Sequence, residues 1–373
     1  MCPCPRFMVT LVTMRGIGLI GPCLTGVLVL SAVLTVSPVL HAEDIFELSA
    51  DGTPDQIKAA ISAGADVEAR AADGSTPLMF AASNNVRVEA VSVLLDAGAR
   101  VEDANNAGWT ALMGAAQSNR NPAVAARLLQ AGAGLEAHDS QGTTALMLAA
   151  SANPSTGVVE KLVAAGANVN ARTVDGWTPL MVACRFNDRP PIVQALLGAG
   201  AAAEDENNEG ASPLILAVSS NAGADVIVLL LRAGAKVGHT TPDGWTPLMS
   251  ALRYNAGSEV ISTLLREGAR VDGRTSDGAG ALHIAAAGTS DPDVIALLLA
   301  AGADVNGRAA DGRTPLMLAA QFTTNPDVVI ALLKGGADGK LALPDGRTAL
   351  DLAARNWILT ASTQYQELVR ACR

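Results

Sequence analysis

Aromatic side chains are scarce in this chain of 373 residues. They make up only 3% of the sequence, although hydrophobic residues make up 49%. The apolar content therefore consists mainly of Ala, Leu and Val, whose side chains are small or of medium size. Such a composition argues against a large core built around aromatic rings. It favours short helices that stack closely on one another.

Cysteine and histidine are also rare. Of the five Cys, three lie within the first 23 residues, and only Cys184 and Cys372 lie further along. His138, His239 and His283 are widely separated, and no Cys-x-x-Cys pair occurs after residue 42. Neither set of side chains has the spacing of a zinc or redox site. We therefore expect no metal, no cofactor and no catalytic residue.

Positive charge is in short supply. The chain carries 26 Lys and Arg against 36 Asp and Glu, which gives a net charge of −10. The first 42 residues hold two Arg and no acid, so the remainder holds 24 basic and 36 acidic residues, a net charge of −12. An excess of acid repels nucleic-acid phosphates and anionic lipid headgroups. We therefore expect no nucleic-acid partner.

Charge is absent altogether from residues 16–40, which are almost wholly apolar. Arg15 precedes this run, and the small residue Ala42 follows it, before an acidic pair. This pattern is typical of a secretory signal peptide. We expect residues 1–42 to be one, cleaved after Ala42, and the mature protein to be periplasmic or secreted. The alternative is an uncleaved N-terminal anchor in the inner membrane, because an apolar run of this length can span a bilayer. Whether translation starts at Met1 or Met14 stays open.

A fixed period of 34 residues governs the rest of the chain. Three residue types recur at this step without interruption: Gly64 through Gly336, Gly74 through Gly346, Leu78 through Leu350 and Ala81 through Ala353. A constant period of this size predicts a repeat solenoid, in which each unit packs only on its neighbours.

Each unit predicts two short helices joined by turns. In one unit, Asp175-Gly176 forms a turn, Thr178 caps a helix and Pro179 occupies its first position. The segment 187–191 ends this helix, and a second apolar helix follows it. Gly200 then closes the second helix with a positive φ angle. Because helices of eight to ten residues are marginal alone in water, stacking must stabilise them.

The sequence resembles the ankyrin-repeat family, of an exported bacterial type. The motifs Asp243-Gly244-Trp245-Thr246-Pro247-Leu248-Met249 and Ala301-Gly302-Ala303-Asp304-Val305-Asn306 carry the resemblance, which covers residues 43–373. Each unit departs from the family pattern by one extra residue between its helices. The family's His in the Thr-Pro-Leu-His motif is Met in most units, and only His283 retains it. Tetratricopeptide repeats share the period, but they lack the extended loop with a β-turn that connects successive ankyrin repeats and is called the finger.

The resemblance implies an all-α repeat solenoid of helix-turn-helix units with extended β-turn fingers. Residues 43–72 would be an N-terminal capping repeat, with a first helix around Ile45, Phe46 and Leu48 and a second over Gln56–Ala63. Residues 73–344 would hold eight ankyrin repeats, and residues 345–373 a C-terminal capping repeat, because terminal repeats expose one face to water. Ankyrin arrays bind other proteins along a concave face made of fingers and first helices.

Two columns of aromatic residues predict where this face would bind. Trp109, Trp177 and Trp245 occupy the finger position before the helix cap, and Phe186, Tyr254 and Phe322 lie nine residues after that position. Both columns step by every second unit, on the order of 20 Å at ~10 Å per helix layer. Arg185 and Arg253 precede two members of the second column. Trp, Tyr and Arg are the residue types that anchor protein interfaces.

Other interpretations stay open at this point. The aromatic columns could be packing residues copied by duplication of a two-unit block. Spaced aromatic faces could also bind carbohydrate or cell-wall material, and a retained N-terminal segment would make the protein a membrane-tethered scaffold. Partner identity, affinity, pathway and oligomeric state are not encoded in any pattern of this sequence. The leading hypothesis is a non-enzymatic protein-binding module.

Overall fold

The computed structural model describes residues 42–187, 189–220 and 222–373. The predicted signal peptide, residues 1–42, therefore lies almost entirely outside the described residues. Within the described ranges the chain forms 21 helices and no β-strand, only three isolated β-bridges in the fingers. This confirms the prediction of an all-α repeat solenoid. In the described part, no helix is both long and apolar enough to cross a membrane.

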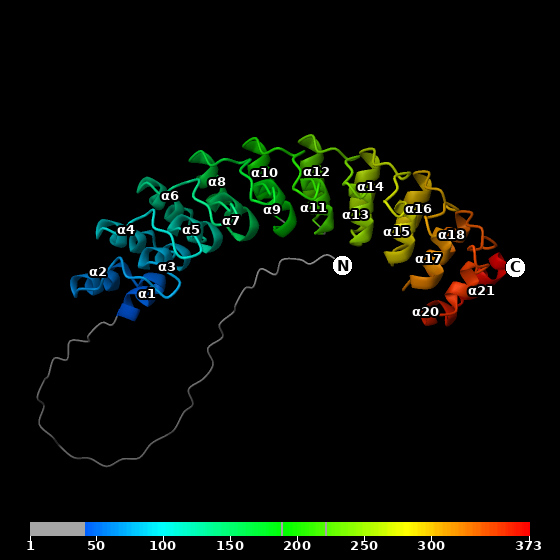
Figure 1. Cartoon of the computed structure of the whole chain (residues 1–373), viewed down its shortest axis with the longest axis horizontal. Coiled ribbons are helices and arrows are strands. Elements are labelled where there is room, and N and C mark those ends of the chain that lie inside the picture. The colour runs from blue at the N-terminus through cyan, green and yellow to red at the C-terminus, as the bar shows by residue number, and fades with distance from the viewer. Residues whose placement is uncertain (1–41, 188, 221) are drawn as a thin grey trace, which may run out of the picture. The chain divides into compact units, whose positions relative to one another are not determined.

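The repeats place one helix of each pair on the inner side of a curved row (Figure 1). These inner helices are α3 (Pro77–Asn84), α5 (Ala111–Ser118), α7 (Ala145–Ala152), α9 (Pro179–Phe186), α11 (Pro213–Ser219), α13 (Pro247–Arg253), α15 (Ala281–Gly288) and α17 (Pro315–Phe322). Each contacts the inner helix of the next repeat.

The second helix of each pair lies on the outer side of the row (Figure 1). The outer helices are α4 (Val88–Asp96), α6 (Pro122–Gln130), α8 (Thr156–Ala164), α10 (Pro190–Gly198), α12 (Ala224–Arg232), α14 (Ser258–Arg266), α16 (Pro292–Ala300) and α18 (Asp327–Lys334). Outer helices likewise contact one another from repeat to repeat. The inner helices thus line the concave side, as the resemblance implied.

Each inner helix begins as the sequence predicts. At α9 the Thr178 hydroxyl accepts a hydrogen bond from the Met181 amide at 3.3 Å, and Pro179 occupies the first turn, where no backbone donor is needed. The helix ends at Phe186, because Asn187 adopts an extended conformation. The second helix, α10, begins at Pro190, so local signals set where the helices of a repeat begin and end.

Alanine makes the close approach of the inner helices possible. The Ala column from Ala81 to Ala353 is at most 1% exposed at every position. The Leu column beside it is buried in all repeats except the last, where Leu350 is half-buried. A methyl group at each contact lets neighbouring helices pack without a gap. The core is therefore one continuous layer between the inner and outer helices.

Glycine is required at both predicted turn columns. Gly200 follows α10 with φ +91°, and Gly244 lies at a finger tip with φ +80°. A side chain at Gly244 would lie 2.6 Å from the Arg274 carbonyl oxygen of the next finger. Glycine is therefore needed in the Gly244 column for two reasons: the positive φ angle and the close contact between neighbouring fingers.

Buried asparagines join neighbouring repeats at the turn between inner and outer helices. The Asn119 side-chain amide donates to the carbonyls of Ala82 and Asn85 in the preceding repeat, at 2.8 and 2.9 Å. Its side-chain oxygen accepts from the Asn121 amide of its own turn at 2.9 Å. Asn85, Asn153 and Asn187 repeat this pattern at 34-residue steps. We call these residues the asparagine ladder.

The ends of the array differ from its interior. The N-terminal pair is α1 (Ala42–Asp51) and α2 (Pro54–Ser62), close to the two helices predicted there. Phe46 of α1 packs on Phe80 of α3, with ring centroids 5.3 Å apart. The C-terminal end has three helices, α19 (Ala349–Ala353), α20 (Trp357–Thr360) and α21 (Gln364–Cys372). Phe46 and Phe80 thus serve the packing of the first helix pair on the next.

Candidate functional site

Large exposed aromatic side chains lie at the C-terminal ends of three inner helices and at the start of α20. Phe186 is 60% exposed, Tyr254 51%, Phe322 49% and Trp357 77%. They lie at the last residue of α9, just after α13, at the last residue of α17 and at the first residue of α20. We call these four residues the aromatic strip. Its exposure is unusual, because a structural role would bury such rings.

The Trp column is held differently. Trp109, Trp177 and Trp245 are half-buried, and the first two pack partly against the core. Their backbone amides are fixed within the finger: the Trp177 amide donates to the Thr173 hydroxyl at 3.0 Å, and Trp245 donates to Thr241 at 3.1 Å. This column therefore contributes to packing of the fingers as well as to the inner surface.

The two predicted columns meet at a single repeat in the part of the chain that the structure describes. The Trp177 and Phe186 rings are stacked, with centroids 5.9 Å apart and planes 25° apart. The Arg185 guanidinium lies 5.9 Å from the centroid of the Phe186 ring, within range of a cation–π contact. Trp109, Trp245, Arg253, Tyr254 and Phe322 occupy other repeats. The predicted residues thus form a series of separate positions along the array.

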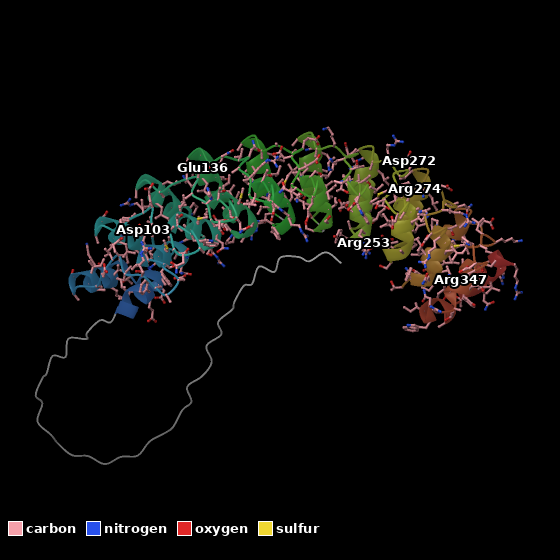
Figure 2. The ribbon with its side chains drawn as sticks, viewed as in Figure 1. Asp103, Glu136, Arg253, Asp272, Arg274 and Arg347 are labelled. Atoms are coloured by element: carbon pink, nitrogen blue, oxygen red, sulfur yellow. The ribbon has the colours of Figure 1, made fainter. Side chains whose placement is uncertain are left out.

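Charge divides the two sides of the array. The inner helices α3 to α17 contain no Asp or Glu, and their basic residues are Arg185 and Arg253. The acids lie on the fingers, on outer helices and on the terminal helices, among them α1 and α19. Residues 43–373 carry a net charge of −12. Arg253 is exposed and lies at the inner margin of the row, whereas Asp272 and Arg274 lie away from that margin (Figure 2).

Many finger acids have structural partners. Glu68 accepts a hydrogen bond from the Arg100 backbone amide at 2.9 Å, and Glu136 accepts one from the Asn168 amide at 2.8 Å. Burial alone would raise the pKa of Glu68, but the Arg100 amide and guanidinium together hold it below its ordinary value. Three other repeats have Asn170, Glu204 or Asn306 at the equivalent position. The side-chain oxygen of each accepts a hydrogen bond from a backbone amide of the following finger. Glu68, Glu136 and Glu204 therefore serve the stacking of neighbouring fingers.

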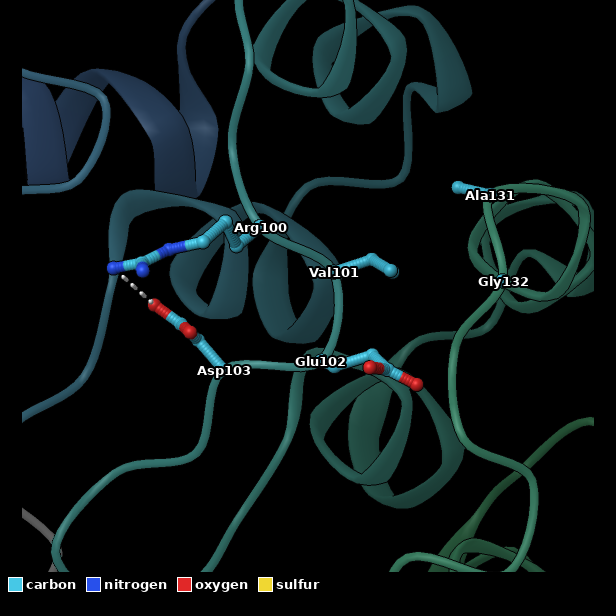
Figure 3. Close-up of a pocket in the computed structure, with 6 residues that line it drawn as sticks. All are labelled: Arg100, Val101, Glu102, Asp103, Ala131 and Gly132. Carbon is cyan, nitrogen blue, oxygen red and sulfur yellow. Dashed lines mark ion pairs between the residues drawn. The ribbon is translucent and has the colours of Figure 1, made fainter.

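A hollow lies between two repeats near the fingers. It is lined by Arg100, Val101, Glu102, Asp103, Ala131 and Gly132. Arg100 and Asp103 point away from the facing segment and pair with each other at 3.5 Å (Figure 3). Arg100 also pairs with Glu68, at 2.7 Å. Two of the three charged residues in the lining, Arg100 and Asp103, are thus engaged with protein groups.

The remaining polar candidates are structural. Cys184 is 1% exposed in α9, and burial raises the pKa of its thiol, so it behaves as a small core residue. His283 is 2% exposed and bonds backbone groups of two repeats. In the described residues, no three His, Cys, Asp or Glu side chains are grouped as metal ligands. None of these residues forms part of the inner surface.

Trp357 was missed by sequence reasoning as a site residue. It lies in the predicted C-terminal capping repeat, outside both predicted columns, yet it is the most exposed of the large hydrophobic side chains in the described residues. Its position follows Thr323 by one repeat, next to the column of Phe322. Arg355, two residues earlier, is exposed and shares the column of Arg185 and Arg253. The period was the signal that could have identified both.

Comparison with known proteins identifies the repeats. The family model described as ankyrin repeats (3 copies) matches six overlapping segments: residues 45–139, 112–207, 146–241, 181–275, 214–309 and 282–370. Among solved structures, the ankyrin repeat domain of human ASB11 is 28% identical, with a TM-score of 0.53. The match covers 61% of this chain and 98% of that one. No curated protein matches the chain.

Proposed function

This chain belongs to the ankyrin repeat family, and from that premise we propose that its inner surface binds a partner protein in the periplasm or extracellular space. Ankyrin repeats are in general protein-binding scaffolds without enzymatic activity. The proposal assigns the contacts to Trp109, Trp177, Arg185, Phe186, Trp245, Arg253, Tyr254 and Phe322. It assigns no catalytic role and no cofactor to any residue.

One observation carries the proposal: the exposed aromatic side chains Phe186, Tyr254 and Phe322 lie on the inner side of the array, where the helices from α3 to α17 contain no acid. Phe186, Tyr254 and Phe322 are each about half exposed, so none of them is consumed by packing within the chain. The side chains around these aromatic and Arg residues are small and uncharged. Such a composition is typical of the centre of a protein–protein interface. This favours binding over the alternative of duplicated packing residues.

The Trp column has a supporting role in this proposal. Trp177 stacks on Phe186 and thereby restricts the orientation of that exposed ring. A ring held in place before binding loses less conformational entropy when a partner covers it. We therefore assign primary contact to the second column, and both contact and support to Trp177.

The test is capture of the partner from an extract of the source cells, followed by titration of the purified partner. The test variant carries Phe186→Ala, Tyr254→Ala and Phe322→Ala in the full chain. Because these side chains are exposed, the variant should keep its thermal stability. We expect its Kd to rise about 100-fold, since each aromatic anchor contributes more than ~1 kcal/mol.

The matched control is Val86→Ala, which removes a side chain that is 54% exposed in the turn between α3 and α4. This variant should bind the partner as the wild type does. Equal binding by the wild type, the triple variant and the control would contradict the proposal. It would indicate that the aromatic columns serve only to pack the repeats.

The location in the proposal rests on residues 1–42, with Arg15, the apolar run and Ala42. The intact mass of the chain isolated from its native cells tests it. A mature chain that begins at Glu43 would support export with cleavage. A chain that keeps the apolar run would instead support the membrane-tethered scaffold.

Carbohydrate binding is the other outcome that the same protein can reveal. Stacking on sugars needs open ring faces, and Trp109 and Trp177 are partly packed against the core, which favours a protein partner. Titration with soluble wall fragments, followed by Trp fluorescence, separates the two. Saturable quenching by glycans, lost in the triple variant, would replace the protein partner with a carbohydrate.

A further inference from the structure

We propose that the aromatic strip binds one extended, acidic segment of the partner, and that it does so on the C-terminal half of the array alone. The inference rests on the proposed function, because it specifies what the inner surface recognises. The strip, as defined above, consists of Phe186, Tyr254, Phe322 and Trp357. Three Arg residues accompany it, namely Arg185, Arg253 and Arg355.

Large and small residues alternate along the strip. Between Phe186 and Tyr254 the same column holds Ser220, and between Tyr254 and Phe322 it holds Gly288. The neighbouring column alternates in step, with Arg185, Ser219, Arg253 and Ala287. Phe186, Tyr254 and Phe322 are thus each separated by a repeat that has only Ser220 or Gly288 at this column, whereas Trp357 follows in the repeat directly after Phe322. Such gaps have room for side chains of a bound segment.

The spacing fits an extended chain. Repeats stack at ~10 Å per helix layer, so successive aromatic residues two repeats apart are separated by about 20 Å. An extended polypeptide advances ~3.4 Å per residue. One residue in about six would therefore meet an aromatic ring, and about 12 residues would connect Phe186 with Phe322.

Arg residues without an ion-pair partner indicate that the bound segment is negatively charged. Arg253 and Arg355 are exposed, and neither forms an ion pair with a residue in the described part of the chain. Finger cations such as Arg70 and Arg172 do form such pairs. The inner helices supply no acid that could take this role. Carboxylates of a partner would therefore complete the pairing.

The acid nearest in sequence to this end is already engaged. The Asp351 carboxylate of α19 accepts hydrogen bonds from the Thr348 amide and hydroxyl, both at 2.8 Å. The net charge of −12 lies largely on fingers and outer helices. Charges more than ~8 Å away are strongly screened at physiological ionic strength. Contact with Arg253 and Arg355 should therefore outweigh repulsion from the rest of the molecule.

The N-terminal half provides an internal contrast. In α3, α5 and α7 the aromatic column holds Asn84, Ser118 and Ala152, and the column of Arg185 holds Ser83, Gln117 and Ser151. These repeats share the fold but have neither aromatic residues nor cations at these two columns, although Trp109 occupies the finger position before α5. The bound segment should therefore align with α9 to α20.

A selection from displayed random 18-residue peptides on the full chain tests the inference. We expect the wild type to select peptides with apolar residues about six positions apart and with several Asp or Glu. The variant Arg253→Glu with Arg355→Glu should bind the selected acidic peptides about tenfold more weakly, and should itself select Lys-rich and Arg-rich peptides. The control Arg232→Glu with Arg266→Glu changes exposed residues of the outer helices α12 and α14 and should alter nothing.

Each alternative outcome has a distinct meaning. Two results would contradict the claim that the bound segment is acidic: selected peptides without an excess of Asp and Glu, or a charge-reversed variant that selects the same peptides as the wild type. Failure to select any peptide would overturn the extended segment. Neither result would affect capture of a folded partner that the triple variant Phe186→Ala, Tyr254→Ala, Phe322→Ala loses. The proposed function and this inference therefore fail separately.

Discussion

At the residue scale, the alanine column limits what the inner helices tolerate. Ala149 of α7 is 0% exposed between neighbouring inner helices, whereas Ala152 at the end of the same helix is exposed. Ala149→Leu inserts three extra carbons into a close-packed contact. We expect a loss of about 1–3 kcal/mol in unfolding free energy, measured by denaturant titration. Ala152→Leu should change stability by less than ~0.5 kcal/mol. Equal effects would contradict the packing assigned to this column.

His283 gives a second residue-scale feature, a polar link between two repeats. Its Nδ1 accepts a hydrogen bond from the Gly280 amide at 3.3 Å, and its Nε2 donates to the Gly307 carbonyl at 3.0 Å. Only the neutral imidazole with the proton on Nε2 satisfies both groups. Gly280 lacks the cap hydroxyl of the other repeats, so the His283 backbone amide has no hydroxyl acceptor there, and the His283 side chain provides only the acceptor for the Gly280 amide. In most other repeats Met takes this position, and the Met79 and Met113 sulfurs accept from the cap amide at 3.4 Å.

This geometry predicts a pH dependence. Burial and, second, the nearby Arg274 charge lower the pKa of His283 below 6.5. The unfolded chain therefore binds the proton more tightly, so stability is full above pH 6.5 and falls as pH drops through the folded-state pKa. His283→Gln should remove this component of the loss between pH 7 and pH 5, as measured by parallel denaturant titrations. Identical pH profiles for the two proteins would refute the assignment.

At the element scale, the asparagine ladder connects each turn to the repeat before it. Asn119→Ala would leave the buried carbonyls of Ala82 and Asn85 without their donor. We expect a loss of about 2–4 kcal/mol in unfolding free energy, since an unsatisfied buried group costs ~1–3 kcal/mol. The control Asn84→Ala removes an exposed amide that bonds only within α3. A loss no larger than that of the control would contradict the ladder.

The ladder also shows where sequence reasoning stopped. The Asn residues recur at the same 34-residue step as the glycines, and one of them, Asn187, was interpreted only as the end of a helix. Their hydrogen-bond partners lie 33 to 37 residues earlier in the chain. A local pattern predicts turns and caps, which depend on nearby residues. It does not predict a bond whose partner is brought close only by stacking.

At the scale of the whole molecule, the ladder is not uniform. Asn255, after α13, is exposed with φ +60°, and Thr289, after α15, bonds only within its own turn. Within the described residues, neither side chain donates to the preceding repeat. Stability in a solenoid is a sum of nearest-neighbour terms, so the middle of the array should open more readily. Amide exchange should be faster in α13 than in α7, and equal protection would contradict this account.

The sequence predicted the architecture almost completely, because the period, the caps and the glycines are local and repeated. It predicted the candidate site less fully. The positions of Trp177 and Phe186 followed from the period, but their unequal exposure and their mutual stacking did not. Trp357 was hidden because its repeat breaks the pattern. Exposure depends on how neighbouring repeats cover a side chain, which a single repeat does not reveal.

The most direct test of a partner-binding inner surface is site-specific photocrosslinking in the native cells. A photoreactive phenylalanine analogue replaces Tyr254 on the inner side, or Gln194 on the outer helix α10, where the side chain is also exposed. The account predicts a discrete crosslinked protein from position 254 and none from position 194. Crosslinking to the same protein from position 194 alone would show that the partner binds the outer helices, and it would contradict the assignment of function to the inner surface.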